Sequence, residues 1–320
     1  MTSQVLLGDC RDVLKTLPAE SAQCCVTSPP YFGLRDYGCA GQIGLEQTPD
    51  AYVAELVAVF REVRRVLRDD GTLWLNLGDS YAGYWGDKKA KAEGRPSAAD
   101  GNGFSMNARP KFHDAFDGSA IKPKDLIGIP WRVAFALQAD GWYLRQDIVW
   151  SKPNPMPESV TDRCTKAHEY IFLLTKSAKY YFDAAAIAEQ SIHAGETVFN
   201  DAGKNSEMGA FGATRGGFLK DGGVTVKDTR NKRSVWTVST KPYSGAHFAT
   251  FPPDLIEPCI LAGSKTGDMV LDPFNGSGTT GEVASRFGRN YTGIELNPAY
   301  VALTEERWRG TTMGLPLEAA

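Results

Sequence analysis

Two short stretches of the chain carry residue types that could do chemistry together. The first, Asp268 to Glu282, reads Asp-Met-Val-Leu-Asp-Pro-Phe-Asn-Gly-Ser-Gly-Thr-Thr-Gly-Glu. Its apolar run ends at a carboxylate, Asp272, and a glycine-rich turn then opens a helix from Thr279. A strand, a glycine turn and a helix in this order present backbone N–H groups and a helix N-terminus to a ligand. A tight turn that binds nothing would show the same pattern.

A phosphate-binding loop is a second interpretation of the glycine turn. Such a loop needs a lysine directly after its last glycine, and here Gly278 is followed by Thr279 and Thr280. Hydrolysis of nucleoside triphosphates is therefore not expected.

The second stretch, Thr27-Ser28-Pro29-Pro30-Tyr31, follows an apolar run over 24–26. Consecutive prolines stiffen a loop, so its acceptor oxygens are aimed before a ligand arrives. Asp-Pro-Phe-Asn-Gly-Ser-Gly-Thr-Thr and Ser-Pro-Pro-Tyr together resemble the motifs of the S-adenosylmethionine-dependent DNA amino-methyltransferases. With the catalytic loop first and the cofactor loop last, the chain is similar to the permuted branch called the beta class.

The resemblance implies an α/β, Rossmann-like methyltransferase fold. Its sheet would be mostly parallel and twisted, with helices on both faces, an antiparallel edge and a circularly permuted order of motifs. The implied reaction moves a methyl group from S-adenosylmethionine to the exocyclic amine of a base flipped out of double-stranded DNA. In the resemblance the Ser28 hydroxyl and the Pro29 carbonyl accept hydrogen bonds from that amine. Pro30 completes the rigid loop, and Tyr31 stacks on the base.

The resemblance also implies a set of cofactor-binding residues. These are Asp9, Thr27, His247, Asp272, Phe274, Asn275, Gly276, Ser277, Gly278, Thr279 and Glu295. Glu295 would accept hydrogen bonds from the ribose hydroxyls, unless it is an ordinary surface carboxylate. Asp9 would lie near the adenine, and capping of the next helix is the alternative. His247 begins a segment similar to the element that closes over the cofactor, although many relatives have proline where this chain has Phe248.

The residue before Pro-Pro-Tyr bears on which base is methylated. In the family, Asp at this position goes mostly with adenine-N6 enzymes and Ser with cytosine-N4 enzymes. Ser28 therefore favours cytosine N4, while adenine N6 stays open because a hydroxyl both donates and accepts. Attack by a cysteine on cytosine carbon would need a Pro-Cys pair, and Pro258-Cys259 lies in a helix-like segment. An RNA or protein methyltransferase, and an inactive DNA-binding scaffold, are more distant alternatives.

Hydrophobic periodicity predicts the elements that position these loops. Strands are expected over 4–7, 23–26, 73–77, 142–150, 269–271 and 291–294, with two antiparallel edge strands over 171–175 and 180–182. Helices are expected after residues 9 and 253, over 125–138, and from 279 and 298. A further helix should be capped by Thr48, start at Pro49 and end at Gly71.

Two stretches, 84–120 and 191–235, lack periodicity and are expected to be inserted loops that read the DNA sequence. Residues 1–83, 121–190 and 236–320 would then form the methyltransferase domain. From 190 to 241, eight basic residues stand against five acidic ones, a net charge of +3 in a chain whose overall net charge is −3. Candidate DNA or base contacts are Trp150, Lys152, Arg215, Lys232 and Arg233. Trp150 could equally be a core residue. The stretches 84–120 and 191–235 could equally be flexible loops that do not contact DNA.

Composition sets the remaining expectations. A chain of 320 residues with 42% hydrophobic residues is large enough for one α/β domain with insertions. The six cysteines show no metal-binding spacing, so reduced thiols and no metal site are expected. There is neither an apolar segment of membrane-spanning length nor a signal pattern, which predicts a cytoplasmic protein that binds no membrane. A homodimer, and a cognate restriction enzyme as partner, are left open.

Overall fold

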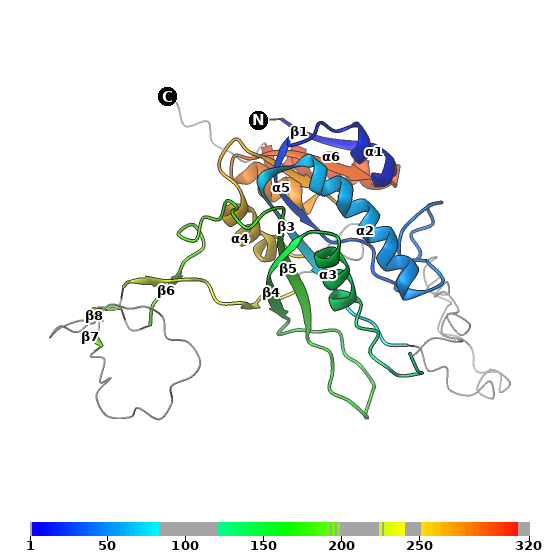
Figure 1. Cartoon of the computed structure of the whole chain (residues 1–320), viewed down its shortest axis with the longest axis horizontal. Coiled ribbons are helices and arrows are strands. Elements are labelled where there is room, and N and C mark those ends of the chain that lie inside the picture. The colour runs from blue at the N-terminus through cyan, green and yellow to red at the C-terminus, as the bar shows by residue number, and fades with distance from the viewer. Residues whose placement is uncertain are drawn as a thin grey trace. The chain divides into compact units, whose positions relative to one another are not determined.

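The computed structural model describes residues 2–82, 121–192, 194–195, 197–198, 224–225, 227–240 and 251–312. The chain divides into a large unit, Met1–Asp183 with Ser234–Ala320, and a small unit, Ala184–Arg233. The large unit holds an eight-stranded sheet (Figure 1). The small unit contains two antiparallel ladders, formed by β6 (Glu189–Gln190) with β9 (Thr229–Arg230) and by β7 (Thr197–Val198) with β8 (Val224–Thr225).

The main sheet is mostly parallel, as expected. Its strands are β1 (Ser3–Leu7), β2 (Ala22–Thr27), β3 (Leu67–Leu77), β4 (Tyr143–Ser151), β5 (His168–Thr175), β10 (Val235–Thr237), β11 (Met269–Asp272) and β12 (Asn290–Glu295). They lie in the order β1-β12-β11-β2-β3-β5-β4-β10. Only the pairs of β5 with β3 and with β4 are antiparallel in this sheet.

The antiparallel strand differs in position from the expectation. β5 lies inside the sheet, because β4 and β10 continue the sheet beyond it. Residues 180–182 form no strand. The backbone of Tyr181 instead donates to the Asp70 carbonyl at 2.9 Å, which fastens this segment beside β3.

The permuted order is visible in the sheet itself. β11 and β12 come late in the chain, yet they lie between β1 and β2. β1 pairs with β12 in parallel from Ser3 opposite Tyr291 to Leu7 opposite Glu295. The cofactor and catalytic motifs therefore follow neighbouring strands, β11 and β2, despite their distance in sequence.

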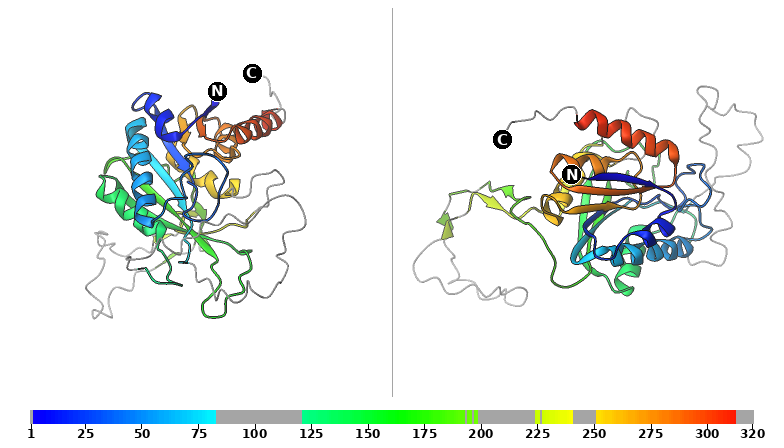
Figure 2. Two further views of the ribbon diagram at one scale, coloured as in Figure 1. Left: turned by 90° about the vertical axis from the view of Figure 1, so that its right-hand side faces the viewer. Right: turned by 90° about the horizontal axis from the view of Figure 1, so that it is seen from above.

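Helices cover both faces of the sheet, as Figure 2 shows. One layer contains α1 (Cys10–Thr16), α2 (Pro49–Val66) and α3 (Ile129–Ala139), and the other contains α4 (Pro253–Gly263), α5 (Thr279–Arg286) and α6 (Pro298–Thr312). Between α2 and the sheet, fully buried side chains such as Leu56, Phe60 and Leu75 form the main core.

The helix α2 starts as expected and ends earlier. The Thr48 hydroxyl caps it by accepting from the Ala51 N–H at 3.1 Å, and Pro49 is its first residue. It ends at Val66, and not at Gly71, because Leu67 turns to an extended conformation and begins β3. Gly71 lies inside that strand, where a Cβ would come within 2.9 Å of a neighbouring carbonyl oxygen.

The helix α3 starts at Ile129, four residues later than Asp125. Pro130 suits its first turn. The Asp79 carboxylate, which follows β3, accepts from the N–H groups of Gly128 and Ile129 at 3.0 Å each. Asp79 therefore fixes the start of the helix from another strand.

Two further observations concern the chain as a whole. All six cysteines are free thiols. Within the described ranges, no helix combines the length and apolar character needed to cross a membrane.

Candidate active site

The motif residues meet at one edge of the main sheet. The carboxyl ends of β1, β2, β4, β11 and β12 point to this edge because these strands are parallel. β5 runs the other way, so its amino end, with Glu169, lies at the same edge. The segments at this edge line a cavity of about 920 Å3. Ligands of open α/β sheets bind in this position.

The loop that follows β2 is held through hydrogen bonds of the Tyr31 side chain. The Tyr31 hydroxyl donates to Glu169 Oε2 at 2.6 Å, and the Ser28 hydroxyl donates to the Tyr31 oxygen at 3.4 Å. Burial raises the pKa of Tyr31 well above its usual value and Glu169 adds to the shift, so the phenol stays protonated and donates. Gly78 makes room for the ring, since a Cβ there would lie 2.4 Å from Tyr31 Cε2.

The two proline carbonyls of this loop have different surroundings. The Tyr52 hydroxyl of α2 donates to the Pro30 carbonyl at 2.8 Å. Among the residues that the structure describes, none donates to the Pro29 carbonyl, which belongs to a residue lining the cavity. Pro29 thus offers an acceptor to a ligand.

Behind Tyr31 lies an ion pair that the sequence did not predict. The Lys152 ammonium contacts Glu169 Oε1, and the two side chains are only 17% and 15% exposed. Asn76 donates to Glu169 Oε2 at 3.2 Å. The Lys152 ammonium also lies 4.2 Å from the centre of the Trp150 ring. A carboxylate at this depth is stabilised only because each oxygen has a partner.

Asp272, at the end of β11, is a buried carboxylate that supports the glycine turn after this strand. It is 1% exposed and accepts from the Thr27 hydroxyl at 2.6 Å, the Thr280 hydroxyl at 2.7 Å and the Phe274 N–H at 3.0 Å. Burial raises its pKa to about 6, against the lowering effect of these hydrogen bonds. Because Thr27 is the last residue of β2, this carboxylate ties the glycine turn after β11 directly to the loop after β2.

Glu295, at the end of β12, is a buried carboxylate of the cavity wall and not a surface residue. It is 9% exposed, and its oxygens accept from the N–H groups of Gly276 and Asn297 at 2.8 Å each. Burial raises its pKa to about 7. A carboxylate oxygen has two lone pairs, so each still has capacity for one hydroxyl of a ligand.

The hydroxyls of Ser277 and Thr279 hold the glycine turn to α6. Arg307 Nη1 donates to Ser277 Oγ at 3.2 Å and to Thr279 Oγ1 at 2.9 Å. Both residues line the cavity, but their side chains already have protein partners.

Asn275 and Gly278 have a similar supporting role. Asn275 Oδ1 accepts from the Tyr291 hydroxyl at 2.8 Å, and its Nδ2 donates to Thr304 Oγ1 at 2.8 Å. Gly278 precedes α5 with φ of 78°, and a Cβ there would lie 2.5 Å from Thr304. The turn needs glycine at this position for its backbone angle and for its contact with α6.

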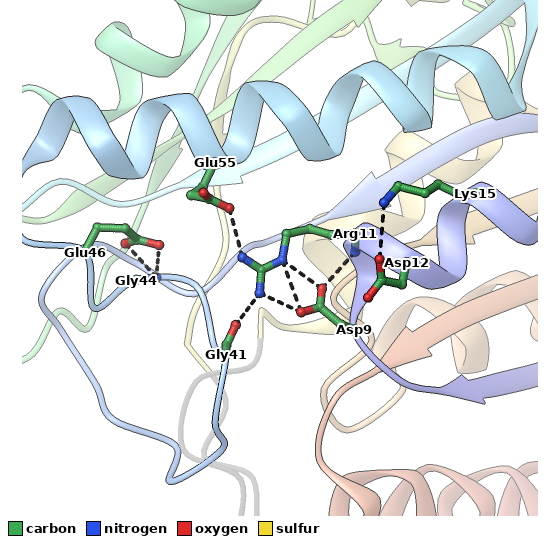
Figure 3. Close-up of polar contacts among 8 residues, drawn as sticks. All are labelled: Asp9, Arg11, Asp12, Lys15, Gly41, Gly44, Glu46 and Glu55. Carbon is green, nitrogen blue, oxygen red and sulfur yellow. Dashed lines mark hydrogen bonds and ion pairs between the residues drawn. The ribbon is translucent and has the colours of Figure 1, made fainter.

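Asp9 does cap α1, as the alternative interpretation proposed, and it also lines the cavity. It accepts from the Arg11 N–H at 2.9 Å, and Arg11 Nη2 contacts its Oδ2 at 2.6 Å (Figure 3). Arg11 lowers the pKa of Asp9. The same guanidinium binds Glu55 of α2 at 2.9 Å and donates to the Gly41 carbonyl at 2.7 Å. Arg11, which the sequence did not single out, therefore fastens the 34–43 segment that forms one cavity wall.

The candidate base and DNA contacts fall in different places. Trp150 and Lys152 both line the cavity, although Trp150 is 4% exposed and donates to the Val238 carbonyl at 2.8 Å. Lys232 and Arg233 belong to the small unit, where both form ion pairs with Glu189.

Some expectations cannot be compared with the structure. His247, Arg215 and the stretch 84–120 lie outside the described residues, as does much of 191–235. Cys259 is described: it lies on α4 and is fully buried, which removes it as a nucleophile. Among the described side chains, no group of His, Cys, Asp and Glu is arranged to hold a metal ion.

Comparison with known proteins identifies relatives along nearly the whole chain. Residues 22–306 match the family model described as DNA methylase. The chain is 51% identical over 303 residues to the type II methyltransferase M.Cfr9I of Citrobacter freundii, covering 95% of this chain and 86% of that protein. It is 47% identical over 307 residues to the type II methyltransferase M.SmaI of Serratia marcescens, covering 95% and 90%.

Solved structures agree with this fold. The cytosine-N4-specific PvuII DNA methyltransferase matches with a TM-score of 0.63 at 18% identity, covering 100% of this chain and 89% of that one. A Thermus thermophilus protein solved in complex with S-adenosyl-L-methionine matches with a TM-score of 0.59 at 22% identity, covering 98% of this chain and 96% of that one.

Proposed function

The chain belongs to the DNA methylase family, and from this premise we propose that it methylates the N4 amine of cytosine in double-stranded DNA with S-adenosylmethionine. One observation carries the proposal. The hydrogen bond from Thr27 to Asp272 joins the catalytic loop to the cofactor loop, and both loops line the same cavity. A methyl donor and an acceptor amine bound to the two loops would therefore meet.

The residues of the cavity fit the cofactor. Glu295 supplies acceptors for the ribose hydroxyls, and Phe274 supplies an apolar surface. The 34–43 segment, which Arg11 fastens, forms the wall beside the adenine. The volume of about 920 Å3 is near the upper end for ligand pockets, which is suitable for a cofactor together with a flipped base. When bound, S-adenosylmethionine supplies an activated methyl group and a sulfur leaving group.

The chain's own residues hold the amine and receive its proton. An exocyclic amine is a poor nucleophile because its lone pair is delocalised into the ring, so positioning and preorganised acceptors must supply the acceleration. In the proposed complex the amine donates to the Ser28 oxygen and the Pro29 carbonyl.

A route for the amine proton leads away from the base. The Ser28 hydroxyl donates to the Tyr31 oxygen, and the Tyr31 hydroxyl donates to Glu169. As the Ser28 oxygen takes the amine proton, its own hydrogen passes to Tyr31 and the Tyr31 hydrogen passes to Glu169. Tyr31 in this account also presents its ring to the base.

The choice of cytosine N4 rests on Ser28, whose hydroxyl replaces the carboxylate typical of adenine-N6 enzymes. Adenine N6 is the second candidate, since a hydroxyl and a carbonyl can accept from either amine.

DNA is proposed to contact the protein beyond the pocket through the stretches 84–120 and 191–235. In the second stretch, Lys232 and Arg233 are among the basic residues that give 190–241 its net positive charge, and the Arg233 side chain is 69% exposed. Basic side chains of this kind contact phosphates and position a duplex. Because the relatives are type II methyltransferases, a restriction enzyme with the same recognition sequence is the proposed functional partner.

Digestion of treated DNA to nucleosides tests the proposal. Unmethylated plasmid DNA is incubated with the protein and S-adenosylmethionine, digested, and examined by mass spectrometry. N4-methylcytosine is the expected product. N6-methyladenine would overturn only the assignment of cytosine as the target base. The absence of any methylated base on several plasmids would refute the proposal that this protein methylates DNA.

A further inference from the structure

Met156 is an exposed apolar residue at the cavity. Its side chain is 84% exposed, and it lines the cavity together with its neighbours Pro155 and Pro157. Single exposed apolar residues are common and by themselves carry no function. What distinguishes Met156 is the way in which its segment is held.

The backbone on the amino side of Met156 is anchored to the segment after β10. Asn154 Nδ2 donates to the Thr240 carbonyl at 3.1 Å, and the Thr240 N–H donates to Asn154 Oδ1 at 2.9 Å. The Thr240 hydroxyl also donates to the Asn154 carbonyl at 3.3 Å. Three hydrogen bonds to one residue fix Asn154 two positions before Met156.

The carboxyl side is anchored as well. Glu158 accepts from Arg163 Nη1 at 2.7 Å and from the Lys166 N–H at 3.1 Å. The Arg163 guanidinium lies 3.8 Å from the centre of the Tyr81 ring. The segment is thus anchored two residues before and two residues after Met156, and it holds an apolar side chain in water. Exposure of an apolar side chain to water is unfavourable, and no contact in the described fold offsets it.

The two prolines make this segment suited to an environment without water. Pro155 and Pro157 have no backbone N–H groups. The residues on both sides of Met156 therefore have no backbone donor that would lose a hydrogen bond to water when the segment is desolvated. Their fixed φ angles also limit the ways in which the segment could fold the side chain back.

We propose that Met156 enters the base stack of DNA at the position that the flipped base vacates. The proposal rests on the proposed function, because only an enzyme that flips its target base leaves such a gap. Apolar wedges, methionine among them, enter between base steps in other DNA-binding proteins. An unbranched thioether adapts to an irregular gap, and Met156 borders the same cavity as Ser28 and Tyr31, which would receive the base.

The test compares two duplexes that differ in the cost of flipping. The site that the wild-type protein methylates in plasmid DNA is first mapped and placed in an oligonucleotide duplex. In one duplex the target base is paired, and in the other it lies opposite an abasic position, where less pairing has to be broken. The values of kcat/KM are measured for the wild type, Met156→Ala, Met156→Leu and Val160→Ala. Val160 is the matched control, since it is 38% exposed on the same loop and does not line the cavity.

Met156→Ala is expected to lower kcat/KM on the paired duplex by about 10- to 100-fold, the factor that burial of a methionine side chain provides. On the abasic duplex it should be within about threefold of the wild type, because the flipped state there needs less stabilisation. Met156→Leu and Val160→Ala should resemble the wild type on both duplexes.

Two results would overturn the proposal. In one, Met156→Ala methylates the paired duplex as fast as the wild type. In the other, it is equally slow on both duplexes, which would make Met156 a part of the pocket wall. Failure of the proposed function would be seen earlier, since the wild-type protein would then methylate no site in plasmid DNA.

Discussion

Replacing Glu169 by glutamine should lower both the free energy of unfolding and the rate of turnover. The two effects can be measured separately. The substitution keeps the size of the side chain and removes its charge. It leaves the Lys152 ammonium without the carboxylate that it contacts, and it weakens the hydrogen bond that Tyr31 donates at 2.6 Å. Breaking a fully buried pair costs about 3–5 kcal/mol of folding free energy. The side chains here keep 15–17% of their exposure, so about 2–3 kcal/mol is expected.

The effect on turnover follows from Tyr31. A hydrogen bond to a charged group contributes about 1.5–3 kcal/mol, so a neutral acceptor should slow single-turnover methylation by roughly 10- to 150-fold. Turnover is measured with excess enzyme on mapped duplex DNA, and the free energy of unfolding by urea titration. Glu62→Gln is the control. Glu62 pairs with Arg65 on α2 at partial exposure, and its loss should cost at most about 1 kcal/mol and leave turnover unchanged.

A double variant separates the two roles of the carboxylate. Glu169→Gln combined with Lys152→Met removes the unpaired ammonium, so the free energy of unfolding should recover while turnover stays low. If turnover recovers together with stability, Glu169 serves only to neutralise Lys152. Wild-type turnover in Glu169→Gln alone would refute the proton route altogether.

Three further residues, Glu295, Gly78 and Arg11, give testable outcomes. Glu295, whose pKa burial raises to about 7, loses an acceptor when protonated, so calorimetry should show cofactor affinity falling below about pH 7 in the wild type and not in Glu295→Gln. Folding raises this pKa from 4.5, so between about pH 4.5 and 7 the folded state binds more protons than the unfolded state. The free energy of unfolding should therefore decrease as the pH rises from about 4.5 to 7, and it should decrease less steeply in Glu295→Gln. Gly78→Ala should place a methyl group against the ring of Tyr31 and lower kcat by about 100-fold at unchanged cofactor affinity. Arg11→Lys, which keeps the charge but cannot bridge Asp9 and Gly41 in the same way, should weaken cofactor binding roughly tenfold without slowing a saturated reaction.

The sequence predicted most of the sheet because its strands end in local signals. An apolar run followed by a glycine or proline turn marks the ends of β2, β3 and β11, and each of these was expected within a few residues. The passage from α2 into β3 was missed because no proline or glycine separates Val66 from Leu67. That boundary is set by pairing of Leu67 with Ala22, a contact between distant residues.

The site was predicted in part, for a related reason. The motif order implies the direction of the strands at this site. Ser28 and Tyr31 follow β2, and Asp272 and Glu295 are the last residues of β11 and β12. Glu169 lies near the start of its strand, so it belongs to the site only because β5 runs antiparallel to β3 and β4. That direction comes from pairing in the sheet, which no local pattern in the sequence records.

Motif membership also does not tell which side chains already have partners within the protein. The side chains of Asn275, Ser277 and Thr279 were grouped with Glu295 as cofactor residues. In the structure these three side chains bind α6 and β12.

The pairing of β1 with β12 has a consequence for protein synthesis. The Thr2 N–H donates to the Asn290 side chain across 288 residues of chain, and the Gly8 N–H donates to the Glu295 carbonyl at 2.8 Å. A ribosome releases the Ser28–Tyr31 loop well before Asp272 and Glu295 are synthesised. Contacts of such long range form slowly. A growing chain therefore carries the loop after β2 long before it has the strands β11 and β12 that complete the cavity.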